Sequence, residues 1–347
     1  MRQVKVRRGA CCVPRGPALS SAAVDASPRG DTPAGADVPG RRHPPHAVAR
    51  VLPWILTILI FTLIFSRVPF AKVWQALAGA RLVPYLAIMA PYSVIYLAID
   101  TFCLTRVINW FNCRIAYADV LPIRASTYLL TLVNSNLGQG GIALYVHRRE
   151  GVPLLEVVSS VLFLMFVELY QLTFFSSLGV VLAPRAVDLP LGAVYAALYG
   201  YLVVHLVVFR LARDWLEQRP ALRILRSFRL ARLRHYLLLA LYKSPNFVMA
   251  TIVYYFALQC FGMRLPYLDL VLYLPIIFFS AALPIGVAHL GAPQLLWIYF
   301  FSAYAPEASL LAFSLATHFI FMIMNAALGI PFLPRATREL MRGAATA

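Results

Sequence analysis

Two short stretches place glycine, proline and hydrogen-bonding side chains inside otherwise apolar sequence. The first, residues 134–146, reads NSNLGQGGIALYV, and the second, residues 280–294, reads SAALPIGVAHLGAPQ. Gln139, His289 and Gln294 can hydrogen-bond without carrying a fixed charge. A helix that starts at such a break leaves backbone N–H groups unpaired and points the positive end of its dipole at the break. Two opposed starts of this kind would suit an anionic phosphate group.

The helix starts themselves can be placed from the sequence. Pro293 suits the first turn of a helix that runs through GAPQLLWIYFF, because no backbone donor is needed there. We expect another start in the first stretch, in GGIALYV, directly after Gln139. The start in the first stretch is called the first helix start below, and the start at Pro293 the second. The alternative interpretation is that the glycines of these stretches only allow helices to pack closely.

Two ionisable residues lie within long apolar stretches. Glu168 is in the middle of LFLMFVELYQL, and Lys243 is in LALYKSPNF. Such groups are costly in a membrane unless they are paired or functional. A Glu168–Lys243 pair would either couple proton binding to transport or simply hold two helices together. Asp100 is expected to reach the membrane interface or Arg106.

Composition indicates the class of protein. The chain has 347 residues, of which 61% are hydrophobic and 13% charged, and its mean hydropathy is +0.74. These values predict an all-α membrane protein with several spans. Lys and Arg number 31 against 14 Asp and Glu. The basic segments flank apolar spans and lack interleaved aromatic residues, which favours positive-inside loops over nucleic-acid binding.

Six apolar stretches are long enough to cross a bilayer as helices, and two further apolar regions are interrupted. The six predicted spans are 51–67, 82–104, 153–183, 190–210, 236–261 and 307–332. The interrupted regions are 125–146 and 268–304.

Arginines orient these spans. Residues 210–236 contain eight arginines, residues 335–342 contain three, and the N-terminal tail contains eight more, so both termini are expected in the cytoplasm. Residues 125–146 must then cross the membrane an even number of times, and they are too few to cross twice. The same holds for 268–304 from the opposite face. Both regions are therefore predicted to be re-entrant hairpins.

The expected domain organisation follows from this topology. The halves 51–183 and 190–332 each read span, span, hairpin, span, in opposite orientations, which predicts an inverted repeat with a site at its interface. Little residue identity is expected between the halves. Residues 51–335 form the membrane domain and 336–347 a cytoplasmic tail.

The first 50 residues are rich in Pro, Gly and Arg and lack apolar periodicity, so we expect a disordered tail. Three interpretations stay open for this tail: an inert appendage, a tether to anionic lipids, or sequence ahead of the true start codon.

Enzyme chemistry finds little support in the sequence. There is no nucleophile elbow, no phosphate-binding loop and no cluster of residues at metal-ligand spacing. We therefore predict a protein that is not an enzyme, with no catalytic residue, cofactor or metal ion.

The two interrupted segments resemble the lysylphosphatidylglycerol synthase transmembrane-region family, also called flippase-like domain proteins, over residues 51–335. In the first motif the matching residues are Asn134 or Asn136, Gly138, Gly141 and Arg148. In the second motif they are Pro284, Gly286 and Gly291. Ile142 and Gln294 stand where the family has glutamate.

The resemblance implies a multi-pass protein of the bacterial inner membrane that moves an anionic phospholipid or a polyprenyl-type lipid between leaflets. No soluble aminoacyl-transfer domain is present in the sequence, so lipid synthesis is not implied. Membrane lipids are the expected partners, and nucleic acid is not. The alternative is a scaffold or regulator that keeps the fold without transporting lipid.

Overall fold

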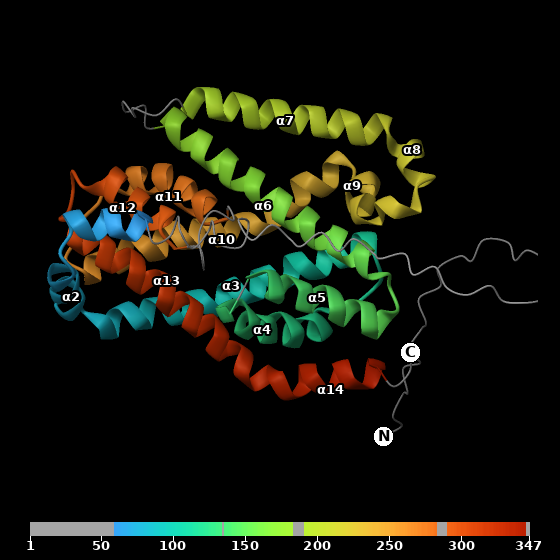
Figure 1. The fold of residues 1–347 in the computed structure, drawn as a ribbon, viewed down its shortest axis with the longest axis horizontal. Coiled ribbons are helices and arrows are strands. Elements are labelled where there is room, and N and C mark those ends of the chain that lie inside the picture. The colour runs from blue at the N-terminus through green and yellow to red at the C-terminus, as the bar shows by residue number, and fades with distance from the viewer. Residues whose placement is uncertain (1–58, 134, 183–190, 283–289, 345–347) are drawn as a thin grey trace, which may run out of the picture. The chain divides into compact units, whose positions relative to one another are not determined.

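The computed structural model describes residues 59–133, 135–182, 191–282 and 290–344. The chain divides into the units Met1–Leu52 and Pro53–Ala347, and every described residue belongs to the second unit. Within the described ranges all regular elements are helical and no strand occurs, which confirms the all-α class (Figure 1). The predicted N-terminal tail, residues 1–50, lies outside the described residues.

The helices follow one another with short connections. After a helical stretch over residues 59–67, the α-helices are α2 (Phe70–Ala78), α3 (Leu82–Phe111), α4 (Tyr117–Val133), α5 (Ser135–Glu150), α6 (Leu154–Leu182), α7 (Leu191–Leu211), α8 (Arg213–Glu217), α9 (Arg226–Leu230), α10 (Leu233–Cys260), α11 (Tyr267–Ala282), α12 (Ala292–Phe301), α13 (Glu307–Gly329) and α14 (Leu333–Ala344). Two 3₁₀ turns, Pro220–Leu225 and Ile330–Phe332, precede α9 and α14.

Five of the described helices are long and apolar enough to cross a membrane. They are Leu82–Phe111, Leu154–Leu182, Leu191–Leu211, Leu233–Cys260 and a continuous helix over Glu307–Arg338. These helices coincide with five of the six predicted spans. The sixth predicted span, 51–67, is described only from residue 59. The chain is therefore a polytopic membrane protein.

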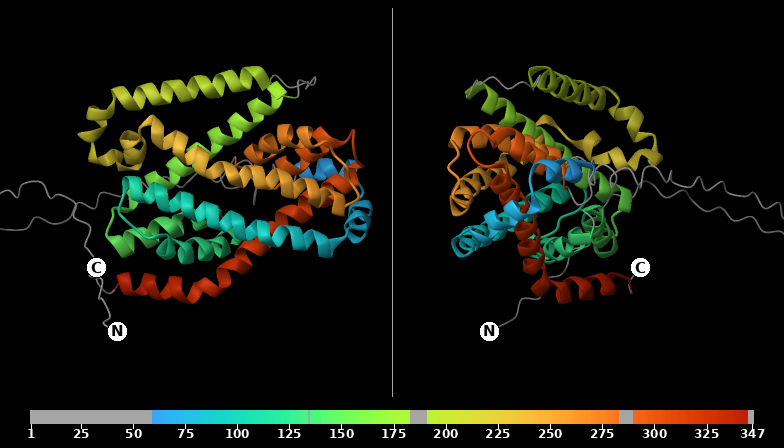
Figure 2. Two further views of the ribbon diagram at one scale, coloured as in Figure 1. Left: turned by 180° about the vertical axis from the view of Figure 1, so that it is seen from behind. Right: turned by 60° about the vertical axis from the view of Figure 1, so that its left-hand side comes forward.

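The surface of α7 supports this conclusion independently. Its buried residue is His205, whereas Val203, Val204, Val207 and Val208 are all about half exposed or more. An exposed run of β-branched apolar residues is disfavoured in water and suited to contact with lipid tails. Figures 1 and 2 show α7 along one edge of the unit, next to α6.

The helices α3 and α10 form an antiparallel pair to which the other long helices are added. The backbone N–H of Arg81, just before α3, donates to the carbonyl of Cys260 at the end of α10 (2.8 Å). At the opposite end, the ring centroids of Trp110 and His235 lie 5.2 Å apart. Around this pair, α6 packs along α11, and α13 packs along α4 (Figure 1).

Glycines allow close approach at both of these outer crossings. A Cβ atom on Gly179 of α6 would lie 2.7 Å from the Cα of Leu272 in α11. A Cβ atom on Gly329 of α13 would overlap the carbonyl oxygen of Ala125 in α4. Small residues at helix crossings are a common means of close packing in membranes, where apolar side chains gain nothing by leaving lipid.

One pair of short sequences recurs in the two halves, which were expected to share little residue identity. Residues 111–119 read FNCRIAYAD, and residues 261–269, which lie 150 positions later, read FGMRLPYLD. Phe, Arg, Tyr and Asp recur at the same positions, directly after α3 and α10. The two joints also share a backbone hydrogen bond, from Cys113 to Ile108 (3.2 Å) and from Met263 to Leu258 (3.1 Å).

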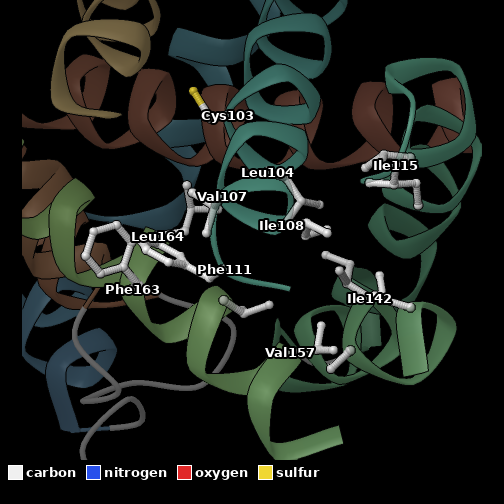
Figure 3. Close-up of a cluster of buried hydrophobic side chains, with 14 of the residues drawn as sticks. Cys103, Leu104, Val107, Ile108, Phe111, Ile115, Ile142, Val157, Phe163 and Leu164 are labelled. Atoms are coloured by element: carbon white, nitrogen blue, oxygen red, sulfur yellow. The ribbon is translucent and has the colours of Figure 1, made fainter. Parts of the chain in front are cut away.

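Two apolar clusters use different parts of α3. Residues from Cys103 to Phe111 pack with Ile142 of α5 and with Phe163 and Leu164 of α6 (Figure 3). The earlier part of α3 packs in a second cluster with α10, α11, α12 and α13. Asp100 lies on α3 between these two apolar regions.

We expect Gly179→Ala and Gly329→Ala each to lower the free energy of unfolding in detergent by about 1–3 kcal/mol, because the added methyl group meets backbone atoms. The measurement is the thermal unfolding midpoint of the purified protein. Gly200→Ala is the matched control, since its Cβ would meet nothing within 4 Å. Equal midpoints for all three variants would show that the crossings are looser than described.

Candidate functional site

A cluster of four charged side chains lies inside the helical unit. Asp100 comes from α3, Arg124 from α4, Glu168 from α6 and Lys243 from α10. Each of these elements is anchored by apolar packing on either side, so the polar groups are held at fixed positions within apolar helices. Their formal charges sum to zero.

Asp100 is the centre of the cluster. The Arg124 guanidinium donates through Nε to the carboxylate oxygen Oδ2 of Asp100. The hydroxyl of Tyr128, one turn further along α4, donates to the same oxygen at 3.0 Å. The ammonium Nζ of Lys243 lies 3.9 Å from the other oxygen, Oδ1. Asp100 therefore faces two cations and a phenol.

Lys243 connects Asp100 to a second acid. Its Nζ lies 2.5 Å from Oε2 of Glu168. The sequence-based prediction of a Glu168–Lys243 pair is therefore matched by the contact, and the pair belongs to a larger network. The side chains of Asp100, Arg124 and Lys243 are 1%, 7% and 4% exposed, whereas that of Glu168 is 37% exposed. Glu168 is the member of the cluster that is open to its surroundings.

Several buried polar groups on the helices that carry these charges have no hydrogen-bond partner among the described residues. They are the hydroxyls of Thr101 and Ser126 and both amide atoms of Asn246. Thr101 follows Asp100, Ser126 lies two residues after Arg124, and Asn246 lies about one turn beyond Lys243. Buried polar groups are normally paired, with water if not with protein. Of these groups, Asn246 lies on the same face of α10 as Lys243, so its amide is suited to bind water or a polar ligand there.

The expected partner of Asp100 was wrong. Arg106 is exposed, and its guanidinium lies over the ring of Phe102 (4.9 Å to the centroid) rather than near the carboxylate. The true partner is Arg124, which lies in LPIRASTYLL, directly before the interrupted region 125–146. A lone arginine in an apolar helix needs a buried acid, and that requirement was the missed signal.

The second predicted helix start is found where the sequence placed it. α12 begins at Ala292, and Pro293 is its second residue. Gly291 precedes it with φ 103°, a conformation that favours glycine. The backbone N–H of Gly291 donates to Oε1 of Gln294 (2.6 Å), and Gln294 is buried. Gln294 thus caps the helix with its own side chain.

A small cavity of about 70 Å³ lies beside this helix start. Pro293, Gln294 and Trp297 of α12 line it together with Ser314 and His318 of α13. It offers hydroxyl, amide and imidazole groups but no carboxylate.

The first predicted helix start is corrected. α5 begins at Ser135, so Gln139 and Gly141 lie within the helix rather than at its start. The physical reason is close packing against α4. A Cβ atom on Gly138 would overlap Thr131, and one on Gly141 would lie 3.1 Å from Leu130. Neither glycine has a positive φ.

Arg148, the arginine of the first family motif, also lies far from the start of α5. Arg148 is exposed near the end of α5, about 20 Å along the helix from Ser135. Its neighbour Arg149 pairs with Asp119 at 2.9 Å and binds the Tyr145 hydroxyl at 2.5 Å. The structure therefore does not bring Arg148 together with the charged cluster.

Some predicted site residues fall outside the description. Asn134, Pro284, Gly286 and His289 lie outside the described residues, and the side chain of Asn136 is not described either. Among the residues that are described, no group of three or more His, Cys, Asp or Glu is arranged to hold a metal ion.

Comparison with known proteins adds no relative. No protein-family model matches the chain, and no curated protein matches it. The interpretation of the cluster therefore rests on its own chemistry.

We expect Asp100→Asn to lower stability by about 3–5 kcal/mol, because it leaves the Arg124 guanidinium buried without a counter-charge. The double variant Asp100→Asn with Arg124→Gln should lose less than the single variant, since no unpaired charge remains on that side. Thermal unfolding in detergent measures both. Arg106→Gln, which removes an exposed arginine from the same helix, is the control. An Asp100→Asn protein as stable as this control would contradict the role of the cluster.

Proposed function

We propose that this chain is a membrane lipid transporter of the flippase type, which moves an anionic phospholipid or a polyprenyl-type lipid between leaflets of a bacterial inner membrane. The observation that carries the proposal is the charged cluster at the contact of α3, α4, α6 and α10. Ionisable groups inside membrane spans are rare and typically mark substrate or ion pathways.

The arrangement of helices supports an inverted repeat as the framework of this transporter. α3 to α6 and α10 to α13 follow the same order, share the joint motif described above, and start from antiparallel helices. We propose that α4–α5 and α11–α12 are re-entrant hairpins between six full spans. α4 has 17 residues, or about 25 Å of helix, which is short of the roughly 30 Å hydrocarbon core. The arginine-rich segments and both termini would then be cytoplasmic.

The cluster lies where the two halves meet. Lys243 comes from the second half, whereas Asp100 and Glu168 come from the first. Any rocking of one half against the other must therefore break or remake the contacts of Lys243. Transporters with inverted repeats place their sites at this kind of interface and alternate access by such motion. Asn246, whose amide has no partner among the described residues, would offer hydrogen bonds to a headgroup that passes the cluster.

The resemblance to flippase-like proteins is consistent with this proposal, although both family glutamates are replaced. Glu168 supplies an acid from a different helix. Substrate contact is proposed for the cluster first and for the α12 helix start second, where Gly291 and Gln294 lie.

The second candidate function is a scaffold or regulator that does not transport lipid. The packing of Gly138 and Gly141 against α4 favours it, because these motif glycines serve helix contact. Gln294 likewise caps its own helix. The transport assay below separates the two functions.

Arg114 and Arg264 occupy equivalent positions in the two joints and are both exposed. In a variant without native cysteines, we expect Arg114→Cys to react with a membrane-impermeant thiol reagent only from the cytoplasmic face, and Arg264→Cys only from the opposite face. The measurement is labelling of intact and opened cells. Labelling of both positions from one face would show that the repeat is not inverted.

Transport is tested with the purified full-length protein in vesicles that contain fluorescent phosphatidylglycerol. We expect the intact protein to carry the label to the inner leaflet well above the rate of protein-free vesicles. The double variant Glu168→Gln with Lys243→Met should reduce this rate at least tenfold, whereas Arg106→Gln should not. The tenfold figure corresponds to about 1.4 kcal/mol in the barrier.

A folded intact protein that moves lipid no faster than protein-free vesicles would reject transport and favour the scaffold. Full activity of the double variant would instead reject the cluster as the site.

A further inference from the structure

An open groove of about 390 Å³ lies between the first half of α3 and the last part of α10. Pro84 and Ile88 form one wall, and Ile252 and Phe256 form the other. Its volume falls within the range of about 300–1,000 Å³ that is usual for small-molecule sites. The groove faces outward from two membrane-spanning helices, so lipid tails are its natural surroundings.

A cation lies at one end of this groove. Arg81 directly precedes α3, is exposed, and makes no ion pair with any described residue. Its backbone N–H bond to Cys260 holds it beside the last turn of α10, where Gln259 also lines the groove. The apolar walls and the polar end together match the two parts of a phospholipid.

The equivalent region at the other end of the helix pair carries aromatic side chains. A shift of 150 positions relates Ile252 to Phe102 and Cys260 to Trp110. There the ring of Phe102 lies 5.2 Å from that of Tyr242, and Trp110 lies 5.2 Å from His235. Aromatic rings thus stand at the positions that Ile252 and Cys260 hold in the groove.

The tyrosines on this side of the helix pair contact α13 instead of filling the groove. Tyr85 and Tyr92 are the counterparts of His235 and Tyr242. The Tyr85 hydroxyl donates to Thr317 of α13 (3.0 Å), and Tyr92 stacks on Phe321 of α13 (5.3 Å between centroids). The two helix contacts therefore differ in the side chains that meet there, and the contact that lacks the second pair of aromatic rings contains the groove.

We propose that this groove binds one anionic phospholipid, with an acyl chain along Ile88 and Ile252 and the phosphate at Arg81 and Gln259. Arginine suits phosphate because its planar fork presents several donors to two oxygens at once. The residue at the start of a spanning helix also lies at the depth of lipid headgroups. Binding here does not depend on transport. In the topology proposed above the start of α3 would face the outer leaflet, and only this placement rests on the proposed function.

The test uses the full-length protein in lipid nanodiscs and phosphatidylglycerol with a photoreactive diazirine in one acyl chain. Labelled peptides are mapped by mass spectrometry, and unlabelled phosphatidylglycerol and phosphatidylcholine compete for the site. We expect labels at residues 84–88 and 252–256, with phosphatidylglycerol the better competitor. Arg81→Gln should weaken its competition roughly tenfold, as expected for the loss of a charge-assisted hydrogen bond.

Two further variants separate the chain and headgroup contributions. Ile252→Phe introduces the aromatic ring that the counterpart residue, Phe102, carries, and it should reduce labelling by either lipid. Arg264→Gln removes an exposed arginine from the loop after α10 and should leave competition unchanged. Labelling that is insensitive to both Arg81→Gln and Ile252→Phe would overturn the proposal, as would equal competition by the two lipids.

The outcome is distinguishable from that of the transport assay. Groove labelling without translocation would reject the transport function and leave the binding site standing. Translocation without groove labelling would reject the binding site alone.

Discussion

The carboxylate of Asp100 is the point on which the arrangement of the long helices depends. In a bilayer, helices gain little from burying apolar side chains against one another, because lipid tails are equally apolar. An unpaired charge at that depth costs several kcal/mol, so the positions of Arg124, Glu168 and Lys243 are closely constrained. Since one oxygen of Asp100 faces Arg124 and the other faces Lys243, α3, α4 and α10 can slide only if the network breaks. Glu168 adds α6 to the same constraint.

The two halves use one framework and fill it differently. At a shift of 150 positions, Asp100 corresponds to Ala250 and Lys243 to Ser93. Glu168 of α6 lies 15 residues after Pro153, and Phe321 of α13 lies 15 residues after Pro306, so the two residues occupy equivalent places in their helices. The contact of Glu168 with Lys243 is therefore ionic, whereas Phe321 packs against the aromatic rings of Tyr92 and Tyr96. Equivalent places in the sequence thus carry charges in one case and aromatic rings in the other.

The helices were predictable from the sequence because lipid allows few solutions. A long apolar run must be helical, and five of the predicted spans were confirmed within a few residues. The start of α12 was also predictable, since glycine followed by proline is a strong local signal. The pairing of Asp100 was not, because it depends on which helices become neighbours. The interior of α5 was misjudged for a related reason. Its glycines look like a break when α4 is ignored, and like a packing surface when α4 is present.

The helix α7 packs sparsely, but it affects how many times the chain crosses the membrane. It buries His205, which binds the Tyr236 hydroxyl at 3.1 Å, and adds little else to the core. Yet the antiparallel arrangement of α3 and α10 requires an odd number of membrane crossings between their starting points. In the topology proposed above, where α4 and α5 do not cross the membrane, α3 and α6 alone would give two crossings, and both halves would point the same way. In that topology α7 supplies the third crossing, so its length would matter more than the identity of the side chains that meet lipid.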